Sequence, residues 1–334
     1  MNNKNVRYDE NNNKLKRKSR LTVCIVAINN GAIIGASDRM ITAGDIEFEP
    51  SVSKILPLTS SIAILTAGDQ SIQMQVYQRA YKIIAERVST EPNKWIDVSF
   101  AAEVYSRCFY NLRKTMIENS ILSSYNLTLD SFIARNKEMS ENLINEINNR
   151  IRRFTYELEG IETIIAGVDN SIPHMTKDGT SAHIYTVKDG EISCHDKLGF
   201  ASIGYGSNHA LSHFMLSKYT KFIPEPKALL TIHQAKKKSE VSPGVGKETD
   251  MFFIAGLGQL IMFDQLQKKD IVKDLDDFYD KYIEKIEESN KEIEEKIANY
   301  FNEMIKKIPK SEQEPSVSPS ASIESEPELK PKEK

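Results

Sequence analysis

The sequence predicts an α+β fold in which two sheets pack face to face and helices cover their outer faces. Three observations lead to this fold class. Several short apolar runs are too short for a helix and too continuous for a half-exposed strand, so they are typical of strands covered on both faces. Amphipathic helical patterns fill the gaps between these runs. The chain has 334 residues, of which 40% are apolar and 8% aromatic, and this is enough for a large core.

The elements follow one another in the order strands, helices, strands, helices. The predicted strands are residues 23–28, 62–67, 163–168 and 251–257. Apolar residues at three- and four-residue spacing predict helices over residues 70–88, 98–117, 141–156, 208–219 and 227–238.

The two ends of the chain differ from this pattern. Residues 1–20 are polar, and five of the seven residues from 14 to 20 are basic. We interpret residues 1–21 as a flexible basic leader or propeptide in preference to a nucleic-acid patch. Residues 269–308 predict a charged amphipathic helix with a narrow apolar seam, either packed on its own domain or acting as a coiled-coil or subunit-contact helix. Residues 309–334 hold five of the twelve prolines and predict a disordered tail.

Composition narrows the classes of function. A net charge of −3 argues against nucleic acid or a membrane surface as a partner, because both require a large positive field. The three cysteines, Cys24, Cys108 and Cys194, are scattered, which favours neither disulfides nor zinc. No histidine spacing indicates a metal site, and we expect no cofactor. With no apolar signal segment or membrane span in the sequence, we expect a cytoplasmic protein.

The first hairpin carries two polar residues in an apolar setting, Thr22 and Asp38. Its turn, Asn29-Asn30-Gly31, tolerates positive φ and allows two loop lengths. A two-residue loop would send the Thr22 and Asp38 side chains to opposite faces of the sheet. A three-residue loop with a bulge at Gly31 would place them on one face, and the sequence permits both.

Lys54 and Gly68 add two further candidates. Lys54 opens an apolar segment and either forms a structural ion pair, extends to water, or holds positive charge against a threonine hydroxyl, which would then lose its proton more easily. Gly68 lies between a strand and a helix. There a glycine lets a backbone N–H approach an oxyanion closely, unless the turn is merely an ordinary one.

Thr22, Asp38, Lys54 and Gly68 fall at the first, seventeenth, thirty-third and forty-seventh positions counted from Thr22. This spacing resembles the β-type subunits of proteasomes and their bacterial two-ring relatives, which are N-terminal-nucleophile threonine hydrolases. Thr42 falls where that family has a threonine that binds the substrate backbone. Three later segments also resemble the family: TIIAGVD (163–169), HIYTVKDGEI (183–192) and ASIGYGSNHA (201–210).

The resemblance covers roughly residues 22–257 and implies a proteasome-like hydrolase domain over residues 22–268, folded as a four-layer αββα sandwich. It implies a threonine-type endopeptidase in which Thr22 is the nucleophile, Asp38 and Lys54 tune it, and the Gly68 N–H binds the oxyanion. The implied partners are peptides or unfolded proteins, a homo- or hetero-oligomeric ring and an ATP-dependent unfoldase.

Two positions depart from the family pattern. Leu21 precedes Thr22 where relatives with a leader typically have glycine, and Tyr205 stands where the family usually has serine. These departures favour an alternative, a non-catalytic structural or assembly subunit that keeps its leader. A third reading is an amidase of the same nucleophile class that acts on a small amide.

Overall fold

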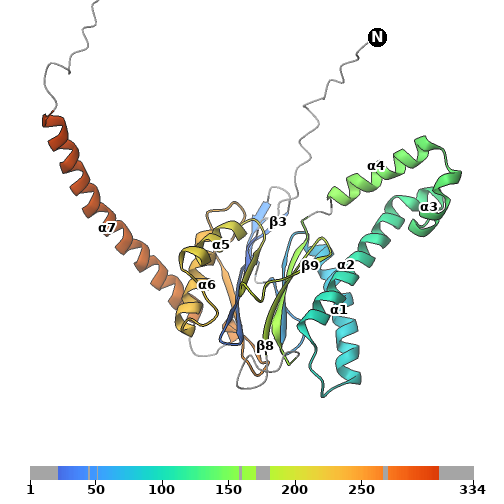
Figure 1. The fold of residues 1–334 in the computed structure, drawn as a ribbon, viewed down its shortest axis with the longest axis horizontal. Coiled ribbons are helices and arrows are strands. Elements are labelled where there is room, and N and C mark those ends of the chain that lie inside the picture. Colours follow the sequence, from blue (N-terminus) through green and yellow to red (C-terminus); the bar gives the residue numbers. More distant parts are fainter. Residues whose placement is uncertain are drawn as a thin grey trace, which may run out of the picture. The chain divides into compact units, whose positions relative to one another are not determined.

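The computed structural model describes residues 22–43, 46–50, 52–157, 160–170, 181–265 and 270–307. In these residues the predicted α+β class with two sheets is confirmed, because two five-stranded antiparallel sheets lie at the centre of the fold (Figure 1). The predicted leader, residues 1–21, and the predicted tail, residues 309–334, lie outside the described residues.

The first sheet joins strands from distant parts of the chain, whereas the second is built from five strands that follow one another in the sequence. The first sheet has the order β10 (Phe200–Ile203), β1 (Cys24–Asn29), β2 (Ala32–Asp38), β11 (Thr249–Ile254) and β12 (Leu260–Met262). The second has the order β5 (Ile55–Pro57), β6 (Ile62–Ala67), β7 (Glu162–Asp169), β8 (Ser181–Lys188) and β9 (Glu191–Cys194). A short separate ladder joins β3 (Ile41–Ala43) to β4 (Ile46–Phe48).

Helices connect the strands, and all five helices predicted between strands are present within a few residues of their predicted ends. They are α1 (Gln70–Thr90), α2 (Val98–Ser120), α4 (Glu141–Glu157), α5 (Ser207–Leu216) and α6 (Glu225–Ser239). The sequence analysis did not predict α3 (Leu129–Arg135) or the short 3₁₀ turns Leu122–Tyr125, Asn136–Glu138 and Phe263–Gln265. The last helix, α7 (Ile271–Lys307), matches the predicted charged helix.

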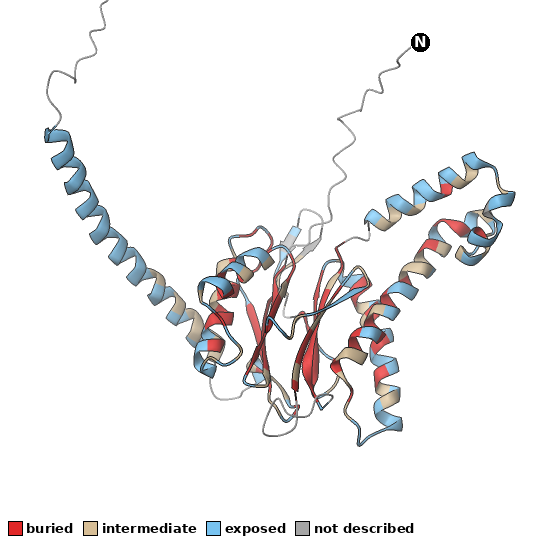
Figure 2. Cartoon of the chain, in the orientation of Figure 1, coloured by how far each residue is buried: buried red, intermediate tan, exposed pale blue. Residues whose placement is uncertain are grey.

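The core explains why β1, β6 and β7 are mostly apolar on both faces. Val26 of β1 and Leu65 of β6 belong to the buried cluster between the sheets. The neighbouring residue Ile25 faces the opposite way, into a cluster with Phe214 of α5 and Ile232 of α6. A third cluster packs α1 and α2 on the outer face of the β5–β9 sheet. Buried residues therefore line both faces of the strands and the inner sides of these helices (Figure 2).

The first hairpin adopts the two-residue loop. Asn29 pairs with Ala32, and the two loop residues have positive φ, 48° at Asn30 and 82° at Gly31. This conformation suits asparagine and glycine and matches the twist of the strands. The backbone N–H of Asp38 donates to the carbonyl oxygen of Val23 at 3.2 Å, so Val23 and not Thr22 is its neighbour across the ladder.

The chain divides into two compact units, and the boundary falls inside α7. Up to Asp276 the helix belongs to the first unit, since Val272 and Leu275 pack on the α5–α6 cluster and Asp276 Oδ1 lies 2.9 Å from His233 Nε2. The described part of the second unit is the rest of α7, from Asp277. Within the described ranges, no helix combines the length and the apolar character that crossing a membrane demands.

Candidate active site

Thr22 lies just before β1 and is held by the turn between β10 and α5. Its carbonyl oxygen accepts a hydrogen bond from the backbone N–H of Gly206 at 3.2 Å. Gly204 has a φ of +86°, and a Cβ there would lie 2.4 Å from the same carbonyl oxygen. Only glycine therefore fits at position 204, and this close approach fixes the position of Thr22, whose side chain is buried.

Asp38 ends β2 and is completely buried. Five donors converge on its carboxylate. Oδ1 accepts from Thr22 Oγ1 at 2.5 Å, from Val23 N at 2.9 Å and from Lys54 Nζ at 2.9 Å. Oδ2 accepts from Met40 N and Gly246 N, each at 3.1 Å. This set of donors is what allows a charged group to be buried, because each one replaces a lost contact with water.

The contact between Thr22 and Asp38 corrects one step of the sequence analysis. Strict alternation with a two-residue loop sends these side chains to opposite faces, yet they form a hydrogen bond. The rule fails because β1 begins only at Cys24. Thr22 lies beyond the ladder, its carbonyl is bonded to Gly206, and its side chain is free to turn towards Asp38.

Lys54 joins the pair from the start of β5. Its carbonyl oxygen accepts from Thr66 N in β6 at 3.3 Å, and its side chain is 9% exposed. Its ammonium donates to Thr22 Oγ1 and to Asp38 Oδ1. The alternative in which Lys54 extends to water is therefore wrong.

The side chains of Thr22, Asp38 and Lys54 each contact the other two, and this arrangement can make the threonine hydroxyl more nucleophilic. A positive charge against a hydroxyl oxygen favours the deprotonated oxygen, which is the nucleophilic form. Asp38 holds the ammonium in place and also accepts from the hydroxyl. Thr22 is thus the residue of the three whose oxygen can attack an electrophile.

Gly68 occupies a turn that only glycine can form. It lies between β6 and α1 with a φ of +109°, and a Cβ there would lie 2.7 Å from the carbonyl oxygen of Gly160. Buried Gln73 of α1 fastens this turn by donating to the carbonyl oxygens of Ala67 at 3.0 Å and Glu162 at 2.9 Å. Gly68 directly follows β6, the strand in which the N–H of Thr66 donates to the carbonyl oxygen of Lys54. The role of Gly68 as an oxyanion donor stays a prediction.

Thr42, the predicted substrate-binding residue, lies in β3 and pairs with Glu47 of β4. These two short strands follow directly after Asp38 and Arg39 in the chain. Its predicted contact with a substrate backbone stays a prediction.

Lys236, a completely buried lysine of α6, was not among the site residues predicted from the sequence. Its ammonium donates to Glu240 Oε1 at 2.7 Å and to the carbonyl oxygens of Gly246 at 2.9 Å and Lys247 at 2.6 Å. Burial lowers the pKa of Lys236 despite the neighbouring Glu240. Because the Gly246 N–H donates to Asp38, Lys236 holds a loop that supports the candidate site.

A sequence signal for Lys236 exists. It lies four residues after Ile232 and one after Ala235, on the apolar side of α6, and four residues before Glu240. A lysine on the core side of a helix with a carboxylate at i+4 indicates a buried pair.

Cys24 lies close to Thr22 in the sequence but is unsuited to nucleophilic chemistry. Its Sγ lies 3.5 Å from the carbonyl oxygen of Thr66, and burial raises the pKa of its thiol. The reactive form of cysteine, the thiolate, is therefore disfavoured.

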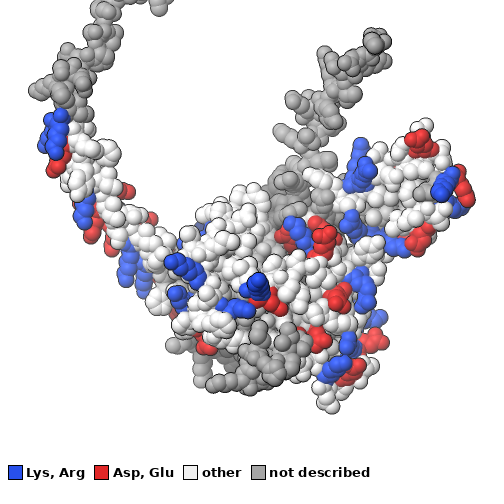
Figure 3. Space-filling view, in the orientation of Figure 1, with Lys and Arg blue, Asp and Glu red and all other residues white. Residues whose placement is uncertain are grey.

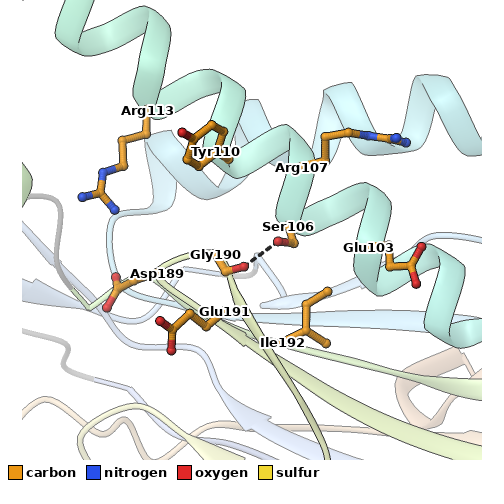
Figure 4. Close-up of a pocket in the computed structure, with 9 residues that line it drawn as sticks. All are labelled: Glu103, Ser106, Arg107, Tyr110, Arg113, Asp189, Gly190, Glu191 and Ile192. Atoms are coloured by element: carbon orange, nitrogen blue, oxygen red, sulfur yellow. Dashed lines mark hydrogen bonds between the residues drawn. The ribbon is translucent and has the colours of Figure 1, made fainter. Parts of the chain in front are cut away.

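A groove of roughly 560 Å³ lies elsewhere, between α2 and the turn from β8 to β9 (Figure 4). Charged side chains of both signs surround it, and Ser106 Oγ donates to the carbonyl oxygen of Gly190 across its floor at 2.5 Å. It includes none of the predicted site residues; its lining is Glu103, Ser106, Arg107, Tyr110, Arg113, Asp189, Gly190, Glu191 and Ile192.

No model of a known protein family matches the chain, and no curated protein sequence matches it. The function is therefore inferred from the residues and their geometry.

Proposed function

We propose that this chain is a threonine-type endopeptidase of the N-terminal-nucleophile class, with Thr22 as the nucleophile. The observation that carries the proposal is the contact of Lys54 Nζ with Thr22 Oγ1, while Asp38 contacts both groups. Two antiparallel sheets with helices packed on their outer faces also suit the αββα sandwich of that class.

The reaction is acyl transfer, and it requires Thr22 to have a free α-amine. Cleavage of the Leu21–Thr22 bond supplies this amine. The amine takes the proton from Thr22 Oγ1 as this oxygen attacks a peptide carbonyl, and Lys54 stabilises the developing alkoxide. The Gly68 N–H stabilises the tetrahedral oxyanion.

The amine then gives its proton to the leaving nitrogen, and the C–N bond breaks to leave an ester on Thr22. A water molecule, deprotonated by the same amine, attacks this ester; the C–O bond to Thr22 Oγ1 breaks, the ammonium returns the proton to Oγ1, and a carboxylic acid leaves with the hydroxyl and the free amine restored. By the same proposal Thr42 binds the substrate backbone. The substrates are peptides or unfolded proteins, the subunits form a homo- or hetero-oligomeric ring, and a separate ATP-dependent unfoldase feeds it.

Hydrolysis of a fluorogenic peptide by the purified chain tests the nucleophile. Thr22→Ala removes the attacking oxygen and should abolish turnover, whereas Thr22→Ser should retain part of it. Thr231→Ala is a matched control, because Thr231 is a buried threonine of α6 that donates to the carbonyl oxygen of Lys227 at 2.8 Å. Unchanged hydrolysis by Thr22→Ala would refute the assignment.

Leu21 supports a second candidate function, a non-catalytic assembly subunit with an intact leader. Tyr205, which is 57% exposed, supports it too, because it supplies no serine hydroxyl at the place where the family usually has one. A full-length chain that assembles with other subunits but hydrolyses no peptide would favour this alternative.

A further inference from the structure

The second unit carries an apolar seam that neither the peptidase proposal nor its alternative uses. Every residue of α7 from 284 to 307 is exposed (Figure 2). The exposed residues include Ile293 at 53%, Ile297 at 47% and Met304 at 54%. A helix of this length that leaves large apolar side chains in water indicates a partner.

The spacing of the seam specifies the kind of partner. Starting at Ile283, steps of three and four residues alternate without a break through Ile286, Asn290, Ile293, Ile297, Tyr300 and Met304. This 3–4 alternation is the heptad of a left-handed coiled coil, with 283, 290, 297 and 304 at the first core position and 286, 293 and 300 at the second. A helix packed on a globular domain shows a wider apolar face.

Asn290 is the polar residue at a core position between Ile283 and Met304. Against the apolar face of a different helix its amide would be buried without a partner, which is costly. Against Asn290 of a parallel, in-register copy, each amide can donate to the other and accept from it. One asparagine at such a position is a known means of fixing register.

Charge is also compatible with self-pairing. The seven core positions from Ile283 to Met304 carry no charged residue. In a parallel in-register pair, the flanking positions place Glu287 against Tyr282 of the other copy and Glu294 against Ser289, so no like charges are opposed. Elsewhere on α7, acidic and basic residues are mixed along the helix surface (Figure 3).

We infer that α7 from Ile283 to Met304 forms a parallel, in-register coiled coil with the same helix of a second copy of this chain. The inference is independent of the chemistry at Thr22. A chain with no peptidase activity would still pair through this helix.

Disulfide trapping in the full-length protein tests both pairing and register. The background variant is Cys194→Ser, because Cys194 is the exposed one of the three cysteines. Ile297→Cys places a thiol at a core position, where equivalent Cβ atoms of a parallel pair come within disulfide range. Glu295→Cys is the matched control, since residue 295 lies on the outer side of the heptad.

Under mild oxidation we expect roughly tenfold more covalent dimer from Ile297→Cys than from Glu295→Cys, as only core positions face each other. Adding Ile293→Asp to Ile297→Cys should abolish the cross-link. Equal cross-linking at 295 and 297, or none at 297, would overturn the inference. Cross-links between separately introduced Ile286→Cys and Ile297→Cys chains would also overturn it, because these residues meet in an antiparallel pair.

Discussion

Replacing Lys54 with methionine removes the positive charge from the candidate site while keeping most of the side-chain volume. Asp38 would remain completely buried, without the ammonium that now lies 2.9 Å from its Oδ1. Leaving one partner of a buried ion pair uncompensated costs about 3–5 kcal/mol. For a domain of this size we expect the melting temperature to fall by roughly 6–20 °C.

The assay is thermal unfolding of Lys54→Met beside wild type and Lys188→Met. Lys188 forms an equally simple pair, 3.1 Å from Glu162 Oε1, but its side chain is 60% exposed. Exposed pairs contribute about 0–1 kcal/mol, so this control should unfold within a few degrees of wild type. Equal melting temperatures of Lys54→Met and Lys188→Met would show that Lys54 does not stabilise the fold by neutralising buried Asp38.

Three further predictions concern two residues that support the site, Lys236 and Gly204, and a buried histidine of β8, His183. Lys236→Met leaves the buried carbonyl oxygen of Gly246 and the carboxylate of Glu240 without the Lys236 donor, and it should cost about 2–4 kcal/mol and slow peptide hydrolysis. Lys237→Met, which removes two partly exposed ion pairs, should change hydrolysis little. Equal rates in the two variants would count against the supporting role of Lys236. Gly204→Ala forces a Cβ against the carbonyl oxygen of Thr22 and should reduce hydrolysis more than Gly190→Ala. Gly190 has a similar φ, but a Cβ there would have its nearest contact at 3.3 Å, to a phenylalanine ring. The reverse order of the two rates would contradict this prediction. His183 resists charging because it is buried, but two aspartates raise its pKa to about 9. Protonated His183 should contribute about 1–2 kcal/mol to the free energy of unfolding below pH 6.5, and this contribution should be lost as pH rises through 9. The test is the free energy of unfolding, measured by denaturant titration at several pH values. A His183→Gln variant whose free energy of unfolding fell between pH 6.5 and 9 as much as that of wild type would refute the prediction.

The secondary structure could be predicted where one physical signal dominated. The runs at 62–67 and 163–168 are mostly apolar on both faces because helices cover one face of the sheet and the other sheet covers the opposite face. The helices over 70–88 and 98–117 bury apolar residues along one side at three- and four-residue spacing, which is the signal that predicted them. The short helix α3 was missed because its seven residues are too few to display a period.

The candidate site shows where sequence rules fail. Alternation along a strand holds only while the residue belongs to the ladder, and Thr22 lies outside it. Its position depends on Gly204 and Gly206, which are distant in the sequence and meet Thr22 only after the first sheet has formed. The support that Lys236 gives to Asp38 through Gly246 could not be predicted from a local sequence pattern either, because it requires α6, the loop that contains Gly246 and β2 to come together in the fold.

The family resemblance carried by the spacing of Thr22, Asp38 and Lys54 implied that these residues meet, and they do. The spacing does not decide whether the peptide bond before Thr22 is cut. In the proposed mechanism, cleavage of that bond frees the α-amine of Thr22, which serves as the base.

The most direct test is the mass and N-terminal sequence of the purified protein before and after treatment with a peptide epoxyketone, which reacts with a hydroxyl and a free amine on one threonine. The proposal predicts a chain that begins at Thr22 and gains the mass of one inhibitor, with Thr22→Ala unmodified. A chain that retains the Leu21–Thr22 bond and gains no mass would contradict it.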